Sequence, residues 1–511
     1  MRTIYILLIA FLASCSGDVP KKSIISDKTV SDYVEKFNKL DNELFATTIP
    51  NSKAAEFLIN NIPRFVCPDK ELEEIYYFRW WTYRKHIRQT PDGYIISEFL
   101  PKVGWSGKYN GISCAAMHHY NEGRWLQNSG EYLDAYTEYW LRGGGSLRTY
   151  SFPISHTLYK YYLVSGDERL LRKYFYDLID NYKAWESERY DAQKGLFWQN
   201  DGQDGMEVSI GGKEEANGYR ATINSYMTAE AEAISLIAKM CGEGKISDIF
   251  KLKAETLQKK MFETLWDDKA QFFKVIAKKE GARMCDTREQ HGYTPWYFNL
   301  ASEKYAAAWQ FLMKPEHFFA PFGPTTAEQC SPDFRISYEG HECQWNGPSW
   351  PYSTAVTLTA LANLLNNQHQ NFITKKDYYT LLKNYAHSHH LTKEDGTVVP
   401  WIDENLNPFN GDWISRTRLK MWENGTWSEG KGGVERGKDY NHSTFCDLII
   451  TGLVGLRPSE DEKINVNPLI PDDWDYFCLE NISYKGHKIT IIYDKTGQRF
   501  NLGKGLKVIK N

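Results

Sequence analysis

The chain has 511 residues, which is too many for one ordinary domain but suits one large domain with a small accessory domain. Lysine and arginine total 61 against 65 aspartates and glutamates, and no basic run stands out, which argues against nucleic-acid binding. Aromatic residues make up 15% of the chain. Much of that content belongs in a core, and some can form a surface for sugars, whose C–H faces lie well on aromatic rings.

The N-terminus has the features of a bacterial lipoprotein signal peptide. Arg2 is a minimal basic region, and residues 4–13 are an apolar stretch too short for a permanent membrane helix. Leu12-Ala13-Ser14-Cys15 resembles a lipobox, so residues 1–15 are predicted to be the signal peptide and Cys15 the lipidated first residue of the mature chain. The alternative is an ordinary cleaved signal peptide.

Lipidation would anchor the protein in the bacterial cell envelope. The expected location is the outer membrane, on its periplasmic or surface face. Residues 16–32 would be a polar tether within an N-terminal segment that runs to residue 45. No later segment is apolar enough to cross a membrane.

The remaining eight cysteines are scattered, with no Cys-X-X-Cys pair. This is neither a zinc pattern nor a disulfide-dense scaffold. Export permits disulfides, but the spacing assigns no pairing. We interpret most of these cysteines as small buried apolar side chains.

From about residue 70 to 455, one helical pattern follows another, beginning with a segment that has a wide aromatic face. The clear patterns cover residues 71–87, 130–141, 154–166, 168–190, 222–242, 246–266, 301–313, 353–367, 375–390 and 442–456. One more near 111–126 and a weak one near 415–422 bring the number close to twelve.

The breaks between these helices are long, acidic and rich in glycine and tryptophan. Twelve helices with functional loops on one face indicate an (α/α)6 toroid, whereas a simple bundle would have short loops. No short repeat of fixed period is visible, which disfavours a regular solenoid. We predict a mainly α protein whose toroid covers residues 46–456.

The tail changes character. Residues 457–511 alternate apolar and polar side chains, with turn signals at Pro471-Asp472 and Lys495-Thr496-Gly497. This pattern predicts a short antiparallel β-domain packed on the toroid.

The stretch FWQNDGQDGMEVSIGG, residues 197–212, brings Asp201, Asp204 and Glu207 close together among glycines. Hydrolysis of a glycosidic bond needs two carboxyl groups, one to protonate the leaving oxygen and one to act on water or on the anomeric carbon. The acid must stay protonated near neutral pH, and crowding with other carboxylates favours that. The alternatives are a solvated acidic loop or a cation site, although the segment lacks EF-hand spacing.

A second acid-rich segment, residues 419–453, holds Glu423, Glu429 and Glu435 before the last predicted helix. Its glycines keep this stretch from being helical. It lies more than two hundred residues after the first acidic loop, so the two meet only if the chain closes on itself. A toroid does that.

At these two segments the chain resembles the six-hairpin glycosidases, which include trehalase, processing α-glucosidase, mannosylglycerate hydrolase and α-L-rhamnosidase. The general acid of those families lies in a Glu-Ser-Gly-X-Asp-X-Ser loop. Gly205-Met206-Glu207 matches its Gly-X-Asp, with glutamate in place of the catalytic aspartate. The resemblance therefore implies Glu207 as the general acid, with Asp204 as the alternative, in an enzyme that inverts the anomeric configuration.

The same resemblance covers roughly residues 70–500 and extends to the base. In those families it is a glutamate before a glycine-rich loop and the final helix, a position that Glu423 matches, with Glu435 as the runner-up. A Trp-Glu that precedes Asn-His, as before Asn441-His442, is a feature of rhamnosidases. Trp345, Gly347 and Trp350 match the group's Trp-X-Gly-X-X-Trp helix start.

Several further residues are candidate sugar contacts. Trp345 and Trp350 stand at a helix entrance marked by Pro348, where they serve as sugar platforms or as core. Arg124 either binds two sugar hydroxyls through its guanidinium or pairs with a structural acid. The full set of candidates is Trp105, Arg124, Trp125, Tyr219, Arg220, Asn224, Trp345, Trp350 and His442.

No metal or other cofactor is expected in the reaction, because the histidines show neither His-Glu-X-X-His nor Cys–His spacing. A polysaccharide lyase would explain the richness in Tyr, His and Asn but leaves the acid loops unexplained. A non-catalytic surface glycan-binding lipoprotein would not need paired carboxylates, and an epimerase would not need export. We therefore predict a monomeric glycoside hydrolase that acts on an oligo- or polysaccharide.

Overall fold

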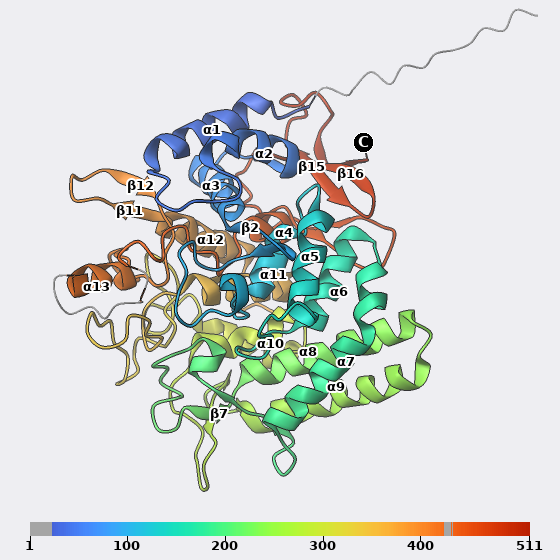
Figure 1. The fold of residues 1–511 in the computed structure, drawn as a ribbon, viewed down its shortest axis with the longest axis vertical. Coiled ribbons are helices and arrows are strands. Elements are labelled where there is room, and N and C mark those ends of the chain that lie inside the picture. Colours follow the sequence, from blue (N-terminus) through green and yellow to red (C-terminus); the bar gives the residue numbers. More distant parts are fainter. Residues whose placement is uncertain (1–22, 424–430, 432, 511) are drawn as a thin grey trace, which may run out of the picture.

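The computed structural model describes residues 23–423, 431 and 433–510. It shows a helical body with a small sheet beside the first helices (Figure 1). The predicted lipidation site Cys15 lies outside the described residues.

Most of the predicted helices are confirmed to within a few residues. The α-helices are α1 Asp27–Leu40, α2 Ala54–Asn61, α3 Lys70–His86, α4 Ala116–Gly123, α5 Ser129–Leu141, α6 Ile154–Ser165, α7 Arg169–Arg189, α8 Ala221–Met240, α9 Gly244–Leu265, α10 Thr294–Tyr297, α11 Pro351–Asn367, α12 Lys375–Ser388 and α13 Ile414–Glu423. Two predictions differ in kind: residues 301–313 contain the 3-10 helix η5 (Glu303–Phe311), and residues 442–456 contain the π-helix η6 (Leu448–Leu453).

The helices follow one another around a ring. In the inner helix α8, nearly every residue from Ala221 to Ala238 is buried, whereas the outer helix α9 buries one face only. Contacts run from α4 to α6, from α6 to α8, from α8 to α10, from α10 to α11 and from α11 to α12, and α12 packs on α3. This closed succession is the predicted (α/α)6 toroid.

A carboxylate closes the ring. Both oxygens of Glu122, on α4, accept backbone N–H groups of Phe445, Cys446 and Asp447 at 2.6–2.9 Å, where the last helix begins. Arg124 and Trp125 in turn donate to the Asp447 carboxylate at 2.6 and 2.7 Å. Helix α4 and the last helix are thus joined by buried, charge-assisted hydrogen bonds.

The C-terminal β-domain is present but is not built from the tail alone. Its four-stranded antiparallel sheet has the order β1-β15-β16-β17. The three tail strands are β15 Tyr476–Tyr484, β16 His487–Asp494 and β17 Gly505–Lys510, whereas β1 is Arg64–Val66. Phe65 faces Leu479 across the β1–β15 ladder.

The other strands form small hairpins and sheets between helices. They are β2 Ile87–Thr90 with β3 Gly93–Ile96, β4 Tyr190–Asp191 with β5 Leu196–Phe197, β6 Gln199–Asn200 with β7 Asn217–Tyr219 and β10 Ile276–Ala277, β8 Trp266–Asp267 with β9 Phe272–Phe273, β11 His390–Thr392 with β12 Val398–Pro400, and β13 Leu456–Arg457 with β14 Asn465–Val466.

The predicted polar tether over residues 16–32 is corrected in its described part. Helix α1 begins at Asp27 with Ser26 as its N-cap, and buries Val30, Val34 and Phe37. These three residues share one helical face, so that face packs on the toroid instead of remaining in solvent. Farther upstream, the backbone N–H groups of Ile24 and Ile25 donate to the carboxylate of Glu480 in β15.

None of the eight cysteines in the described residues is bonded to another, and four of them are buried. Within the same residues, no helix combines the length and the apolarity needed to cross a bilayer.

We expect Glu122→Ala to weaken the closure of the ring. Three backbone N–H groups at the start of the last helix would lose their acceptor in a buried place, which costs roughly 3 kcal/mol of unfolding free energy. Thermal denaturation followed by circular dichroism measures this as a lower Tm. Glu131→Ala, at an exposed position on the adjacent helix α5, is the matched control. Equal Tm values for the two variants would contradict the assignment.

Candidate active site

A cavity of about 260 Å³ lies where the two acid-rich regions meet. Its walls come from loops that are far apart in the sequence. The lining residues are Glu98, Trp105, Ile112, Cys114, Tyr150, Gly205, Glu207, His341, Glu342, Cys343, Trp345, Trp350, Glu404, Lys431, Arg436, Tyr440 and His442. Four of them are glutamates and three are tryptophans, a composition that suits a sugar site.

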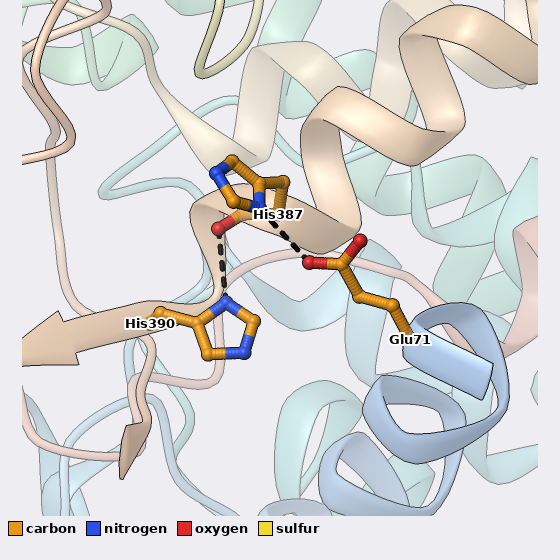
Figure 2. Close-up of side chains that lie close together, drawn as sticks. All are labelled: Glu71, His387 and His390. Atoms are coloured by element: carbon orange, nitrogen blue, oxygen red, sulfur yellow. Dashed lines mark hydrogen bonds and ion pairs between the residues drawn. The ribbon is translucent and has the colours of Figure 1, made fainter. Parts of the chain in front are cut away.

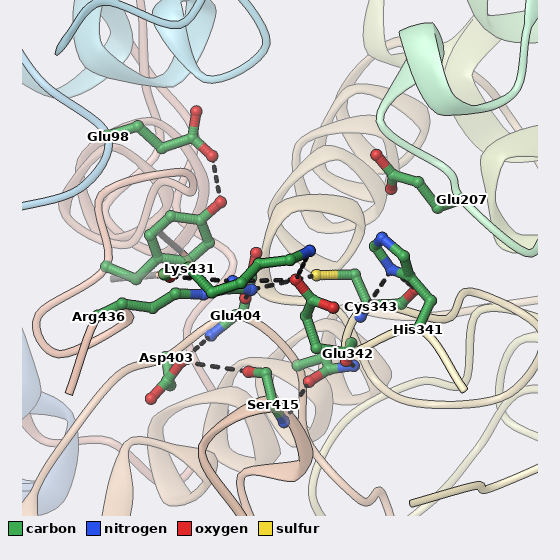
Figure 3. A network of polar contacts seen from close by, with 12 residues as sticks. Glu98, Glu207, His341, Glu342, Cys343, Asp403, Glu404, Ser415, Lys431 and Arg436 are labelled. Carbon is green, nitrogen blue, oxygen red and sulfur yellow. Dashed lines mark hydrogen bonds and ion pairs between the residues drawn. The ribbon is translucent and has the colours of Figure 1, made fainter. Parts of the chain in front are cut away.

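Glu207 follows the 3-10 turn η3 (Gly202–Asp204) and points into the cavity (Figure 3). The turn ends at Gly205, whose φ is +74°, and a Cβ there would lie 2.8 Å from the Cys114 sulfur. The turn therefore requires glycine. Trp345 Nε1 donates to a Glu207 carboxylate oxygen at 3.2 Å.

Burial raises the pKa of Glu207 to about 7, and the neighbouring charge of Glu404 adds to this effect. The opposing influences, which include His341 and the Trp345 N–H, are weaker. A carboxyl group with this pKa is largely protonated in slightly acid solution, as a general acid must be.

An aromatic wall flanks Glu207. The rings of Trp345 and Trp350 stack at 4.3 Å, and Trp350 stacks on Tyr352 at 4.6 Å. Trp345 and Trp350 border the cavity and are buried in the structure. They contribute both to the core and to the wall of the site.

Glu98 reaches the cavity from the side opposite Glu207 (Figure 3). The Tyr440 hydroxyl donates to one of its oxygens, while the other is buried without a hydrogen-bond partner. Burial raises the pKa of Glu98 to about 8, and the charges of Glu404 and Glu207 add to the rise. At neutral pH, Glu98 is therefore mainly a protonated acid.

Arg436 supplies the main positive charge of the site. Its guanidinium binds Glu342 at 3.0 Å and Glu404 at 2.6 Å, and Lys431 binds Glu342 at 2.9 Å. Against the effect of burial, Arg436 and Lys431 hold the pKa of Glu342 down to about 2. Behind Glu404, burial raises the pKa of Asp403 to about 7.

The cavity thus holds carboxyl groups in two protonation states. Glu207 and Glu98 favour the protonated form. Glu342 and Glu404 are ion-paired with Arg436. Acid–base hydrolysis needs such an arrangement, in which the surroundings of two titratable groups give them different pKa values.

The predicted crowding of acids in the 197–212 loop is not what raises the pKa of Glu207. The carboxylate that contributes to the rise is Glu404, from a distant segment, and the dominant cause is burial. Asp204 is buried, accepts a hydrogen bond from the Thr222 hydroxyl and does not line the cavity. Glu214, an acid just beyond this loop, forms an exposed ion pair with Lys279 at 2.5 Å.

The two base candidates lie in different places. Glu423 ends helix α13, and its side chain is not among the described parts of the chain. Glu435 pairs with Arg416 at 2.6 Å and borders a separate groove. The base role therefore stays a prediction for both residues.

The candidate sugar contacts divide into two groups. Trp105, Trp345, Trp350 and His442 line the cavity. The other five are buried elsewhere among structural partners: Arg124, Trp125, Tyr219, Arg220 and Asn224. For example, Arg124 forms its ion pair with Asp447, and the Asn224 side chain bonds the backbone of Phe197.

Sequence reasoning missed Glu98, Glu342, Glu404, Arg436 and Tyr440. The stretch Trp401-Ile402-Asp403-Glu404, with paired acids after a tryptophan between helices, was an available signal for one of them. The others become recognisable only through their partners in space.

Two groups of side chains in the described residues could hold a metal ion. Glu71, His387 and His390 form one, in which His387 Nδ1 bonds Glu71 at 2.9 Å and His390 bonds the His387 carbonyl oxygen at 3.0 Å (Figure 2). The other is His317, Glu328 and Cys330. Neither group lines the cavity around Glu207, so neither assigns a metal to that cavity.

A toroid of helical hairpins around a cavity of glutamates and tryptophans defines the six-hairpin glycosidases. The sequence model of the mannosylglycerate hydrolase MGH1-like glycoside hydrolase domain matches residues 108–443. The chain belongs to this family. A second model, the C-terminal domain of glycosyl hydrolase family 65, matches residues 456–510.

Solved structures agree with this assignment. One described as "Sialidase" is 40% identical, with a TM-score of 0.86 over 95% of this chain and 43% of its own. A GH78 family rhamnosidase of Bacillus sp. GL1 is 12% identical, with a TM-score of 0.53 over 84% of this chain and 40% of its own. The rhamnosidase shows the fold alone, and this chain spans less than half of either protein.

The raised pKa of Glu207 predicts a pH-dependent stability difference for Glu207→Gln. Between the ordinary value of 4.5 and about 7, the folded chain holds a proton that the unfolded chain releases, so the wild type loses stability as the pH rises. The amide has no such loss. Its advantage in unfolding free energy should grow between pH 4.5 and 7 to at most about 3 kcal/mol.

Urea denaturation at pH 5 and pH 8 measures this difference. Glu342→Gln is the control, because the contribution of that carboxylate is fully present at both pH values and is lost only as the pH falls from 4.5 toward 2. Its difference from the wild type should therefore not change between pH 5 and pH 8. A pH-independent difference between Glu207→Gln and the wild type would show that Glu207 is ordinarily solvated.

Proposed function

We propose that this protein is a glycoside hydrolase that removes a terminal sugar from an oligo- or polysaccharide, with Glu207 as the general acid. The observation that carries the proposal is a buried Glu207, whose pKa burial raises to about 7, that faces ion-paired carboxylates across a cavity walled by tryptophans. At about 260 Å³, the cavity is below the ~300–1,000 Å³ of sites for drug-sized ligands, which suits one sugar ring at the reacting end.

We infer an inverting mechanism from the family resemblance. Inversion needs a carboxylate base that activates a water, with about 6.5–9.5 Å between the two carboxyl groups. Among the described residues, Glu404 fits best, because it lines the cavity, is ion-paired with Arg436 and influences the pKa of Glu207. The resemblance favours Glu423. The two assignments require separate tests.

The charge of the cavity supports a neutral sugar as substrate. Its two cations, Lys431 and Arg436, already have carboxylate partners in Glu342 and Glu404. A sugar that bears a carboxylate would add a like charge beside Glu342 and Glu404, which disfavours binding. The name of the longer structural relative therefore does not define the substrate proposed for this chain.

On a neutral glycoside found by screening, Glu207→Gln should lose at least ~10²–10⁴-fold in turnover, because the proton for the leaving oxygen is missing. A substrate with a good leaving group should partly restore the activity of this variant, since such a group departs without protonation. Glu404→Gln should lose activity that the good leaving group does not restore. Product release followed by chromatography measures each rate, and sialosides should be poor substrates throughout.

Glu435→Gln tests the runner-up base. Because Glu435 lies outside the cavity, this variant should keep nearly wild-type turnover, and its inactivity beside an active Glu404→Gln would move the base role to Glu435. If Glu404→Gln is active and Glu423→Gln is not, the base is Glu423. Asp204→Asn should lose less than Glu207→Gln; the reverse order would move the acid role to Asp204. Proton NMR of the first product gives the stereochemistry, and retained configuration would contradict inversion.

The lipid anchor is a proposal from the sequence. We expect the mature chain to incorporate labelled palmitate in a bacterial host and to enter the membrane fraction, and Cys15→Ala to abolish both. Recovery of unlabelled wild-type protein in the soluble fraction would favour the ordinary signal peptide.

A further inference from the structure

A second cavity, of about 870 Å³, lies among helices α4, α6, α8 and α11 and the start of the C-terminal domain. It shares no lining residue with the catalytic cavity. Its inner wall includes Arg124, His156, Lys160, Asp447 and Arg457. No step of the proposed hydrolysis uses this cavity.

The acid of the inner wall already has its counter-ion. Asp447 accepts from the guanidinium of Arg124 and the indole N–H of Trp125 through the same oxygen, at 2.6 and 2.7 Å. Both Arg124 and Asp447 are buried. The charges of this pair cancel, and its position is fixed by the closure of the ring.

Two further cations face the same space without an acidic partner. Arg457 donates to the carbonyl oxygen of Thr451 at 3.2 Å and to the side-chain oxygen of Asn363, both neutral acceptors. In the part of the chain that the structure describes, the Lys160 ammonium forms no ion pair. Burial, together with the charges of Arg124 and Arg457, lowers the pKa of Lys160 to about 7.

The inner wall also holds a spare hydrogen-bonding group. His156 Nε2 is buried and has no hydrogen-bond partner among the described residues. Arg457 and the protonated form of Lys160 give the inner wall more positive charge than its one carboxylate, already paired with Arg124, can balance. The mouth carries exposed charges of both signs, Glu232, Lys239, Asp248, Lys251 and Glu255, which water and salt screen.

Lys160 and Arg457 are half-buried. Charge held partly out of water without a counter-ion is costly, and a bound ion of opposite sign lowers that cost. We propose that this cavity binds a small tetrahedral oxyanion of the phosphate or sulfate class between Lys160 and Arg457. Such an anion accepts several charge-assisted hydrogen bonds at once, and His156 is placed to supply another donor. The cavity is large enough for the anion to be free or to be carried on a sugar.

Isothermal titration calorimetry of the full chain with inorganic phosphate, sulfate and glucose 6-phosphate, at constant ionic strength in chloride, tests the proposal. We expect saturable binding and a Tm that rises with anion concentration, because the ligand binds only the folded state. Tighter binding of glucose 6-phosphate than of phosphate would identify a sugar-borne anion. Equal affinities would identify a free one.

Lys160→Met should lower the affinity for the anion at least ~10-fold, which corresponds to about 1.4 kcal/mol. It should not lower the Tm in chloride, since it removes a cation that lacks a partner. Lys160→Gln is the second variant if the methionine is not tolerated, and Lys259→Met, on the exposed face of α9, is the matched control. Turnover on a neutral glycoside should stay unchanged in all three.

Two results would overturn the proposal. One is wild-type protein that shows no anion binding beyond the chloride control. The other is Lys160→Met that binds as tightly as the wild type. Because the readout is binding and not hydrolysis, failure here leaves the proposed glycosidase activity untouched.

Discussion

The bond between Glu122 and the start of the last helix is the constraint on which the site depends. Three backbone N–H groups from residues 445–447 converge on one buried carboxylate that belongs to α4. The candidate active-site cavity takes its walls from segments near residues 98, 207, 342, 404 and 436. These segments meet only because the ring is closed. Closure thus positions the walls of the cavity, although Glu122 itself does not line it.

Electrostatics within the cavity follows from how its carboxyl groups are partnered. Glu342 has two cationic neighbours and stays ionised, whereas Glu207 has one indole N–H and favours its proton. A single guanidinium, Arg436, holds two of the glutamates in place. Glutamates only a few side chains apart therefore take different protonation states, and ordinary neighbouring residues are enough to produce this difference.

Much of the fold could be predicted from the sequence, because helices such as α3, α8 and α12 repeat apolar residues at helical spacing over many turns. The tail strands alternate clearly enough to be recognised. Strand β1 was not, since three residues carry no periodicity and its partner lies over four hundred residues away. Helix α1 was not predicted, because its many polar residues resemble those of a tether.

The residues of the candidate site could likewise be predicted only in part. Glu207 could be found because a glycine-rich loop and a family motif surround it in the sequence. Glu404 and Arg436 could not, because their roles arise from an ion pair between separate segments. Arg124 is the converse case, a predicted sugar contact with a structural role. Nothing near it in the sequence shows that its guanidinium forms an ion pair with Asp447, far along the chain.

The pairing of β1 with β15 has a consequence for biogenesis. Residues 64–66 leave the ribosome early, yet the strand beside which they lie is completed only at Tyr484. Until then, this part of the nascent chain has no sheet to join, and its backbone groups remain hydrated or bound to a chaperone. Pairing across so long a loop is slow. The sheet therefore assembles only after nearly all of the sequence is available.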